Sequence, residues 1–134
     1  IELKYLDCET DGLRGNKQDE TTQLVVLDWL NQLPIYDLIA LEKTILTTKS
    51  FLCGITLLRS NVNDIETLKE LYQFNKNSID EDYYHKTLEE LVELGNLETI
   101  YQTEEWGEVE DTHDVDKHDW LRNLASAALV CHHN

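Results

Sequence analysis

The stretch that decides the fold is residues 35–59, which read IYDLIALEKTILTTKSFLCGITLLR. Its apolar residues recur at helical spacing at Leu38, Leu41, Ile45, Leu52, Ile55 and Leu58, and three more widen the apolar face, at Ile39, Leu46 and Phe51. A helix that is apolar on most of its sides is usually the central helix of its bundle. The stretch therefore predicts one long central helix over residues 35–59.

Shorter helices are predicted around it. The first begins near Asp19 or Thr21 and ends before Pro34, because a proline disfavours the helical conformation of the residue that precedes it. The others are expected at about residues 63–72, after a capping box of Asn63 and Glu66, at 84–101 with a possible break at Gly95, and at 116–130. The small residues 125–128 of the last helix permit close packing against the central one.

The start of the chain has a different pattern. Residues 2–8 roughly alternate between apolar and polar, which favours a short strand or an extended segment, and residues 11–16 are typical of a turn. We therefore expect an extended lead-in over residues 1–16 and a helical domain over residues 17–134. The predicted fold class is mainly α, a helical bundle with a short β or extended N-terminal lead-in.

The charge limits the possible partners. The chain has 134 residues, of which 27 are acidic and 11 basic, so its net charge is −16. Nucleic acid and anionic lipid surfaces would be repelled, and no apolar run approaches membrane-spanning length. A protein partner with basic or apolar surface fits better, although acidity that serves solubility is the alternative.

No catalytic chemistry is evident. The chain carries neither a Gly-x-Ser-x-Gly motif nor a glycine-rich phosphate loop. Cys8, Cys53 and Cys131 lie far apart without paired ligand spacing, which indicates three reduced thiols and no zinc site. We therefore predict that the protein is not an enzyme and needs no cofactor.

Residues 104–120 are the segment most suggestive of function, because they combine many carboxylates with two histidines and two tryptophans. Glu110 and His113 have the i, i+3 spacing that di-iron bundles use, with Asp82 and His85 as an imperfect second pair. That site needs two further inward carboxylates, and the predicted core offers mainly Leu and Ile, so metal binding is the weaker alternative. A solvated acidic loop leading into a helix N-terminus is another. Neither explains Trp106 or Trp120, at least one of which we expect to pack and hold the acidic groups in place.

The string Trp106-Gly107-x-Val109-Glu110-x-x-His113-Asp114, followed by Arg122 and the small-residue helix, resembles a known family. These are the mitochondrial chaperones that assemble the α subunit of the ATP synthase catalytic head, numbered twelve among the ATP synthase assembly proteins. Residues 40–50 are similar to the family's long helix. The resemblance covers residues 37–131 well and residues 1–32 loosely.

The resemblance implies a non-enzymatic chaperone of the mitochondrial matrix. It would bind the unassembled α subunit and shield the surface that later contacts the β subunit. The family's critical acidic residue would fall on Glu110, and the implied client-binding residues are Trp106, Gly107, Glu108, Glu110, His113 and Asp114. The implied fold is a small β-rich N-terminal part followed by a helical C-terminal domain, which most of this chain represents.

Some positions differ from the family pattern. The family has more chain before its long helix, which predicts a missing segment near Gln32 and Leu33. The long stretch at residues 75–84 resembles fungal members, and Asp111-Thr112 replaces an aromatic-small pair of animal members. We expect a monomer, since no heptad seam is evident. Besides the chaperone, a carboxylate/His metal-binding bundle and a generic acidic interaction domain remain as alternatives.

Overall fold

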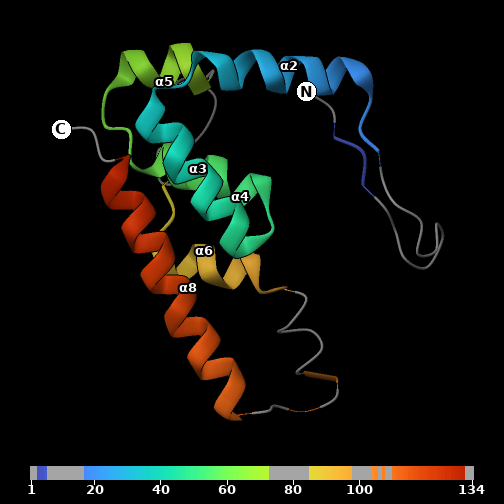
Figure 1. The fold of residues 1–134 in the computed structure, drawn as a ribbon, viewed down its shortest axis with the longest axis vertical. Helices are drawn as coiled ribbons and strands as arrows, with labels where there is room; N and C mark the ends of the chain where they lie inside the picture. The colour runs from blue at the N-terminus through green and yellow to red at the C-terminus, as the bar shows by residue number, and fades with distance from the viewer. Residues whose placement is uncertain are drawn as a thin grey trace. The chain divides into compact units, whose positions relative to one another are not determined.

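The computed structural model describes residues 3–5, 17–72, 85–97, 104–105, 107 and 110–131. The chain forms two compact units, residues 1–33 and 34–134. The first contains α2 (Glu20–Gln32), and the second contains α3 (Ile35–Thr48), α4 (Phe51–Ser60), α5 (Ile65–Tyr72), α6 (Leu88–Gly95) and α8 (Glu110–Val130) (Figure 1). The described residues are mainly helical, which confirms the predicted mainly α class.

The predicted N-terminal strand is not found in the part of the lead-in that the structure describes. Residues 3–5 have no regular secondary structure, and residues 1–2 and 6–16 lie outside the described residues. No strand occurs anywhere in the described ranges. The domain division after residue 16 and the missing segment near Gln32 and Leu33 stay predictions.

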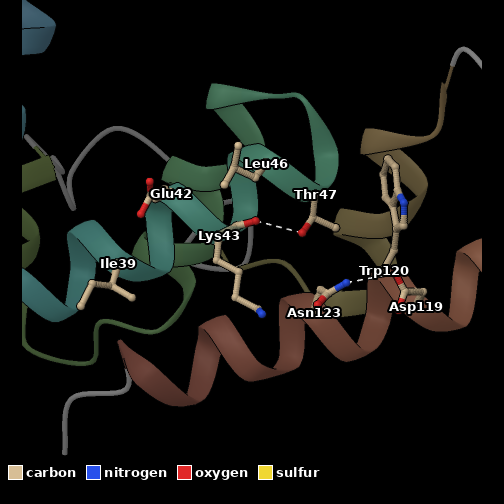
Figure 2. A pocket seen from close by; sticks show the side chains of 8 residues that line it. All are labelled: Ile39, Glu42, Lys43, Leu46, Thr47, Asp119, Trp120 and Asn123. Carbon is tan, nitrogen blue, oxygen red and sulfur yellow. Dashed lines mark hydrogen bonds between the residues drawn. The ribbon is translucent and has the colours of Figure 1, made fainter.

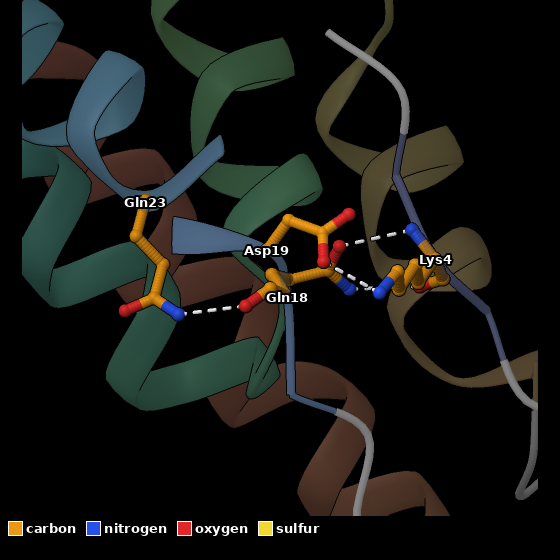
Figure 3. Close-up of polar contacts among 4 residues, drawn as sticks. All are labelled: Lys4, Gln18, Asp19 and Gln23. Atoms are coloured by element: carbon orange, nitrogen blue, oxygen red, sulfur yellow. Dashed lines mark hydrogen bonds and ion pairs between the residues drawn. The ribbon is translucent and has the colours of Figure 1, made fainter. Parts of the chain in front are cut away.

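In the first unit, side chains rather than a neighbouring strand bind the backbone of the lead-in (Figure 3). The Lys4 amide donates to Gln18 Oε1 at 2.9 Å, and Gln18 Nε2 donates back to the Lys4 carbonyl at 2.7 Å. Lys4 Nζ lies 2.6 Å from Asp19 Oδ1, but both side chains are more than half exposed, so this ion pair adds little stability. Helix α2 follows directly, because the Gln23 amide donates to the Asp19 carbonyl at 3.0 Å, as predicted from the sequence.

The prediction of one long helix over residues 35–59 is wrong, because α3 and α4 are separate helices. Lys49 adopts the left-handed conformation, with φ of 58°, and ends α3. Thr48 Oγ1 donates to the Thr44 carbonyl at 2.8 Å and accepts from the Ser50 amide at 3.2 Å. Ser50 Oγ then accepts from the Cys53 amide and caps α4. Threonine and serine side chains bind the backbone locally and so compete with helix continuation.

Helix α3 lies at the centre of the second unit and packs along both α4 and α8, while α6 contacts α4 and α8 (Figure 1). A Cβ at Gly54 would lie 2.6 Å from Leu41 Cδ1, so the two helices approach closely there. The side chains that fill this core are almost fully buried and come from every helix in the group: Ala40, Leu41, Leu57, Leu58, Leu91, Val92, Leu124 and Ala127. Helix α8 packs along α3, and Ala127 is buried, which agrees with the predicted packing of the last helix against the central one.

Several helices begin or end a few residues away from the predicted positions. Asp64, rather than Asn63, caps α5, because its Oδ2 accepts from the Thr67 amide at 2.9 Å. Helix α6 is shorter than predicted and begins at a capping box in which Thr87 Oγ1 and the Glu90 side chain each accept a backbone amide. Helix α8 begins six residues before the predicted Asp116. Of the helices in the described part of the chain, none is long and apolar enough to cross a membrane.

The end of α8 is tied to the turn after α4. Asn61 Nδ2 donates to the Ala128 carbonyl at 3.1 Å and to Cys131 Sγ at 3.2 Å. Burial raises the pKa of the Cys131 thiol above its ordinary value; the Asn61 hydrogen bond lowers this pKa, and the charge of nearby Asp37 raises it. Cys131 and Cys53 are both buried free thiols, while Cys8 lies outside the described residues.

Removing the Leu124 side chain should test this core. Leu124 is fully buried, so Leu124→Ala should lower the free energy of unfolding by about 2–5 kcal/mol through lost burial and the cavity left behind. Leu129 lies on the same helix but is 79% exposed, so Leu129→Ala should change stability by no more than about 0.5 kcal/mol. Urea unfolding followed by circular dichroism measures both, and equal losses would contradict the described orientation of α8.

The raised pKa of Cys131 predicts how stability depends on pH. As pH rises past about 8.5–9, the thiol of the unfolded chain loses its proton before the folded one does, so unfolding becomes more favourable. The free energy of unfolding should therefore fall more steeply with alkaline pH in the wild type than in Cys131→Ala. Denaturation curves between about pH 7 and 10 test this, and parallel pH profiles would show that Cys131 titrates normally.

Candidate functional site

The acidic segment singled out from the sequence forms the beginning of α8. The helix starts at Glu110, so Glu110 and His113 occupy positions three residues apart on one side of it, and Asp114 follows one turn after Glu110. Negative charges in the first turns of a helix are favourable, because the helix dipole is positive at that end. The side chains of these three residues, and all of Trp106 and Glu108, lie outside the described residues.

Gly107 is the described residue that precedes this helix. Its φ is +90°, a conformation that other L-residues rarely adopt, and a Cβ there would contact nothing within 4 Å. The glycine of the Trp-Gly motif is thus explained by backbone conformation and not by close packing.

Trp120 anchors α8 against the rest of the second unit. A Cβ placed on Gly95 would lie 2.9 Å from Cζ3 of the Trp120 ring and 3.4 Å from Thr48 Cβ. The ring therefore lies over Gly95 at the end of α6. Thr48 of α3 also lies close to this glycine. The expectation that a tryptophan of this segment packs is confirmed for Trp120, and its role in holding the acidic groups in place stays a prediction.

A groove of about 530 Å³ runs between α3 and α8 (Figure 2). Helix α3 contributes Ile39, Glu42, Lys43, Leu46 and Thr47, and α8 contributes Asp119, Trp120 and Asn123. In Figure 2, Ile39 lies at one end of the groove and Trp120 at the other. The groove thus begins one helical turn after the acidic first turns of α8 and combines apolar with charged side chains.

Hydrogen bonds orient part of the lining. Asp119 forms an ion pair with Arg122, and its Oδ2 accepts from Asn123 Nδ2 at 3.2 Å. Thr47 Oγ1 donates to the Lys43 carbonyl at 2.9 Å, which fixes the orientation of its side chain at the groove. Glu42, Lys43 and Asp119 are all exposed, but Asp119 is already paired with Arg122, so Glu42 and Lys43 are the charges that the groove offers to a partner.

The sequence reasoning missed this groove. The apolar spacing predicts Ile39 and Leu46 on a widened core face, but they are 46% and 62% exposed. The signal that marks them as surface residues is the pair Glu42-Lys43, which lies on the same side of the helix between them. A core face would not carry two exposed charges between its apolar positions.

The residues of the metal alternative are not brought together by any described contact. His85 Nδ1 lies 3.3 Å from the Ser60 carbonyl, and the neighbouring Lys86 amide donates to Ser60 Oγ at 3.0 Å. The side chains of Glu110 and His113, and all of Asp82, lie outside the described residues. Across the described ranges, no group of three His, Cys, Asp or Glu side chains is arranged to hold a metal ion.

Fold and site together define an acidic, mainly α-helical protein whose last helix carries a carboxylate-rich start and one wall of an open groove. No family model and no solved structure matches the chain. It is 41% identical over 131 residues to Protein ATP12, mitochondrial, of Saccharomyces cerevisiae, and 29% identical over 130 residues to Protein atp12, mitochondrial, of Schizosaccharomyces pombe. The chain is thus similar to ATP12 proteins along nearly its whole length, which confirms the resemblance carried by the Trp-Gly motif. Each match covers 97% of this chain but 36% of the relative, so the chain spans about a third of the length of these two proteins.

The contact between Gly95 and Trp120 can be tested by adding one methyl group. Gly95→Ala should lower the free energy of unfolding by about 1–3 kcal/mol, because the new Cβ overlaps the indole ring. Trp120→Phe removes the atoms that clash, so the double variant should lose less than the sum of the two single changes, by about 1 kcal/mol. Thermal unfolding of all four proteins measures this coupling. Strictly additive losses would mean that the ring does not lie on Gly95.

Proposed function

We propose that this chain is part of a non-enzymatic chaperone of the mitochondrial matrix that assembles the catalytic head of the ATP synthase. It binds the unassembled α subunit and shields the surface that later contacts the β subunit. The observation that carries this proposal is the similarity to two mitochondrial ATP12 proteins over 97% of the chain. It acts as a monomer.

The charge and surface of the chain support this function. A subunit that has not yet met its partner exposes apolar interface, which needs temporary cover. The net charge of −16 attracts a client with basic residues, such as those of an open nucleotide site, and speeds their encounter. The groove between α3 and α8 exposes apolar side chains beside acidic ones, which suits such a surface.

The beginning of α8 is the proposed centre of client binding. The contact residues are Trp106, Gly107, Glu108, Glu110, His113 and Asp114, with Glu110 as the main charge. The backbone of Glu110 belongs to the helix whose Trp120 packs against Gly95, so a carboxylate there is carried on a helix and not on a loop. A rigid charged group loses less entropy on binding than one on a loose loop.

Charge reversal at Glu110 tests the site. Glu110→Lys should leave the protein folded and weaken capture of isolated α subunit by about tenfold or more, as expected for the loss of a charged contact. Glu70→Lys makes the same change of charge at an exposed position in the last turn of α5 and should bind nearly as the wild type does. Co-purification with separate α and β subunits, at low and moderate salt, measures both the affinity and the selectivity.

The outcomes separate the candidate functions. Selective capture of α that Glu110→Lys weakens and Glu70→Lys does not is the expected result. Equal capture of α and β, weakened equally by both substitutions, would indicate a generic acidic interaction domain. If the wild type captures neither subunit and carries stoichiometric iron or manganese, the metal-binding alternative replaces the chaperone.

A further inference from the structure

Helix α3 has two apolar faces, and only one of them is buried. The buried face carries Ala40, Leu41, Thr44 and Thr48, which are at most 4% exposed. The other face carries Ile35, Ile39 and Leu46, which are 63%, 46% and 62% exposed. These three lie four and seven residues apart, so they form one stripe along the helix. Exposed apolar stripes of this kind mark interaction surfaces more often than scattered single residues do.

The stripe ends in the groove between α3 and α8. Ile39 and Leu46 line one wall, and the partly buried Trp120 closes the groove at the far end (Figure 2). Ile39 and Leu46 are seven residues apart, which corresponds to about 10 Å along a helix, or two turns. That length matches a helical ligand that inserts apolar side chains at positions i, i+3 or i+4, and i+7.

The charges of the groove indicate what kind of segment it accepts. Helix α3 contributes the acid Glu42 and the base Lys43, and α8 contributes Asp119, whose charge is compensated by Arg122, so the preference for a basic partner comes from the overall charge. With the overall charge of −16, the site favours positive charge at its edges. A second copy of this chain would bring another charge of −16, so charge repulsion opposes self-association through this groove.

We infer that the groove between α3 and α8 binds an amphipathic helical segment of the client, with its apolar side chains against Ile39, Leu46 and Trp120. Lysine or arginine residues at the edge of that segment face Glu42. The inference rests on the proposed function and deepens it, because it gives the chaperone a second contact beside the acidic start of α8. The client is thus recognised by an apolar face with basic flanks.

Truncating the apolar wall tests the groove. The double variant Ile39→Ala, Leu46→Ala should bind isolated α subunit roughly tenfold more weakly than the wild type, as expected when two interface side chains are lost. The matched control is Leu52→Ala, Leu97→Ala, which removes two leucines that are 56% and 59% exposed but do not line the groove. The control should bind within about twofold of the wild type. Both variants should unfold at nearly the wild-type temperature, because all four side chains lie largely at the surface.

The charged residues of the groove give a second, signed readout. Glu42→Gln should weaken capture, whereas Lys43→Gln should strengthen it, since the client's edges are basic. Both effects should shrink as salt is raised. Wild-type affinity in the double alanine variant, or effects of the same sign from the two glutamine substitutions, would overturn the inference while leaving the capture of α by the wild type intact.

A synthetic probe separates this inference from the proposed function. A helix-forming peptide of about 15 residues, with a leucine face flanked by lysines, should bind the wild type and the Leu52/Leu97 control but not the Ile39/Leu46 variant. If the wild type captures no α subunit, the proposed function is wrong, and this peptide result alone decides the groove. Peptide binding that is equal in all three proteins would overturn the groove assignment. Sedimentation that shows a dimer in the wild type and a monomer in the Ile39/Leu46 variant would instead assign the groove to self-association.

Discussion

The packing of α3 against α4 and α8 is the contact on which the second unit depends. It requires the chain to reverse after α3, which the left-handed Lys49 and the Ser50 cap accomplish. It also requires close approach, which Gly54 permits by leaving room for Leu41. Because α4 and α8 together cover only one face of α3, its other apolar face stays exposed, and the groove beside it is a direct consequence of this arrangement.

Helix α8 connects this core to the proposed client site. Its middle is fixed by Trp120 over Gly95 and by the buried Leu124, and its end is held by the hydrogen bonds from Asn61. The carboxylate-rich first turns extend from this fixed part. Groups carried on a helix are positioned more precisely than groups on a loop, which suits a recognition site. The same helix also supplies one wall of the groove, so the two proposed contacts belong to one helix.

The sequence predicted what depends on local signals. Apolar periodicity predicted that the helices exist, and Pro34 predicted the boundary before α3. The motif at residues 106–114 predicted the similarity to ATP12 proteins. The break after Thr48 was missed because apolar residues keep helical spacing across it, while the competing hydrogen bonds of threonine and serine leave no mark in that pattern. The start of α8 was placed too late, since its first turns carry acids and no apolar stripe. The groove was missed because periodicity cannot tell which of two apolar faces a neighbouring helix will cover.

In the proposed function, the acidic start of α8 and the groove between α3 and α8 make different contributions to holding a client that must later be released. Charge acts over about 8 Å at physiological ionic strength, so the acidic chain gathers a basic client before contact. The groove acts only on contact and offers two aliphatic side chains and part of an indole ring, much less than a standard protein interface buries. An interaction of this size is transient by itself. Competition from a larger interface can end such a contact without any chemical step to drive release.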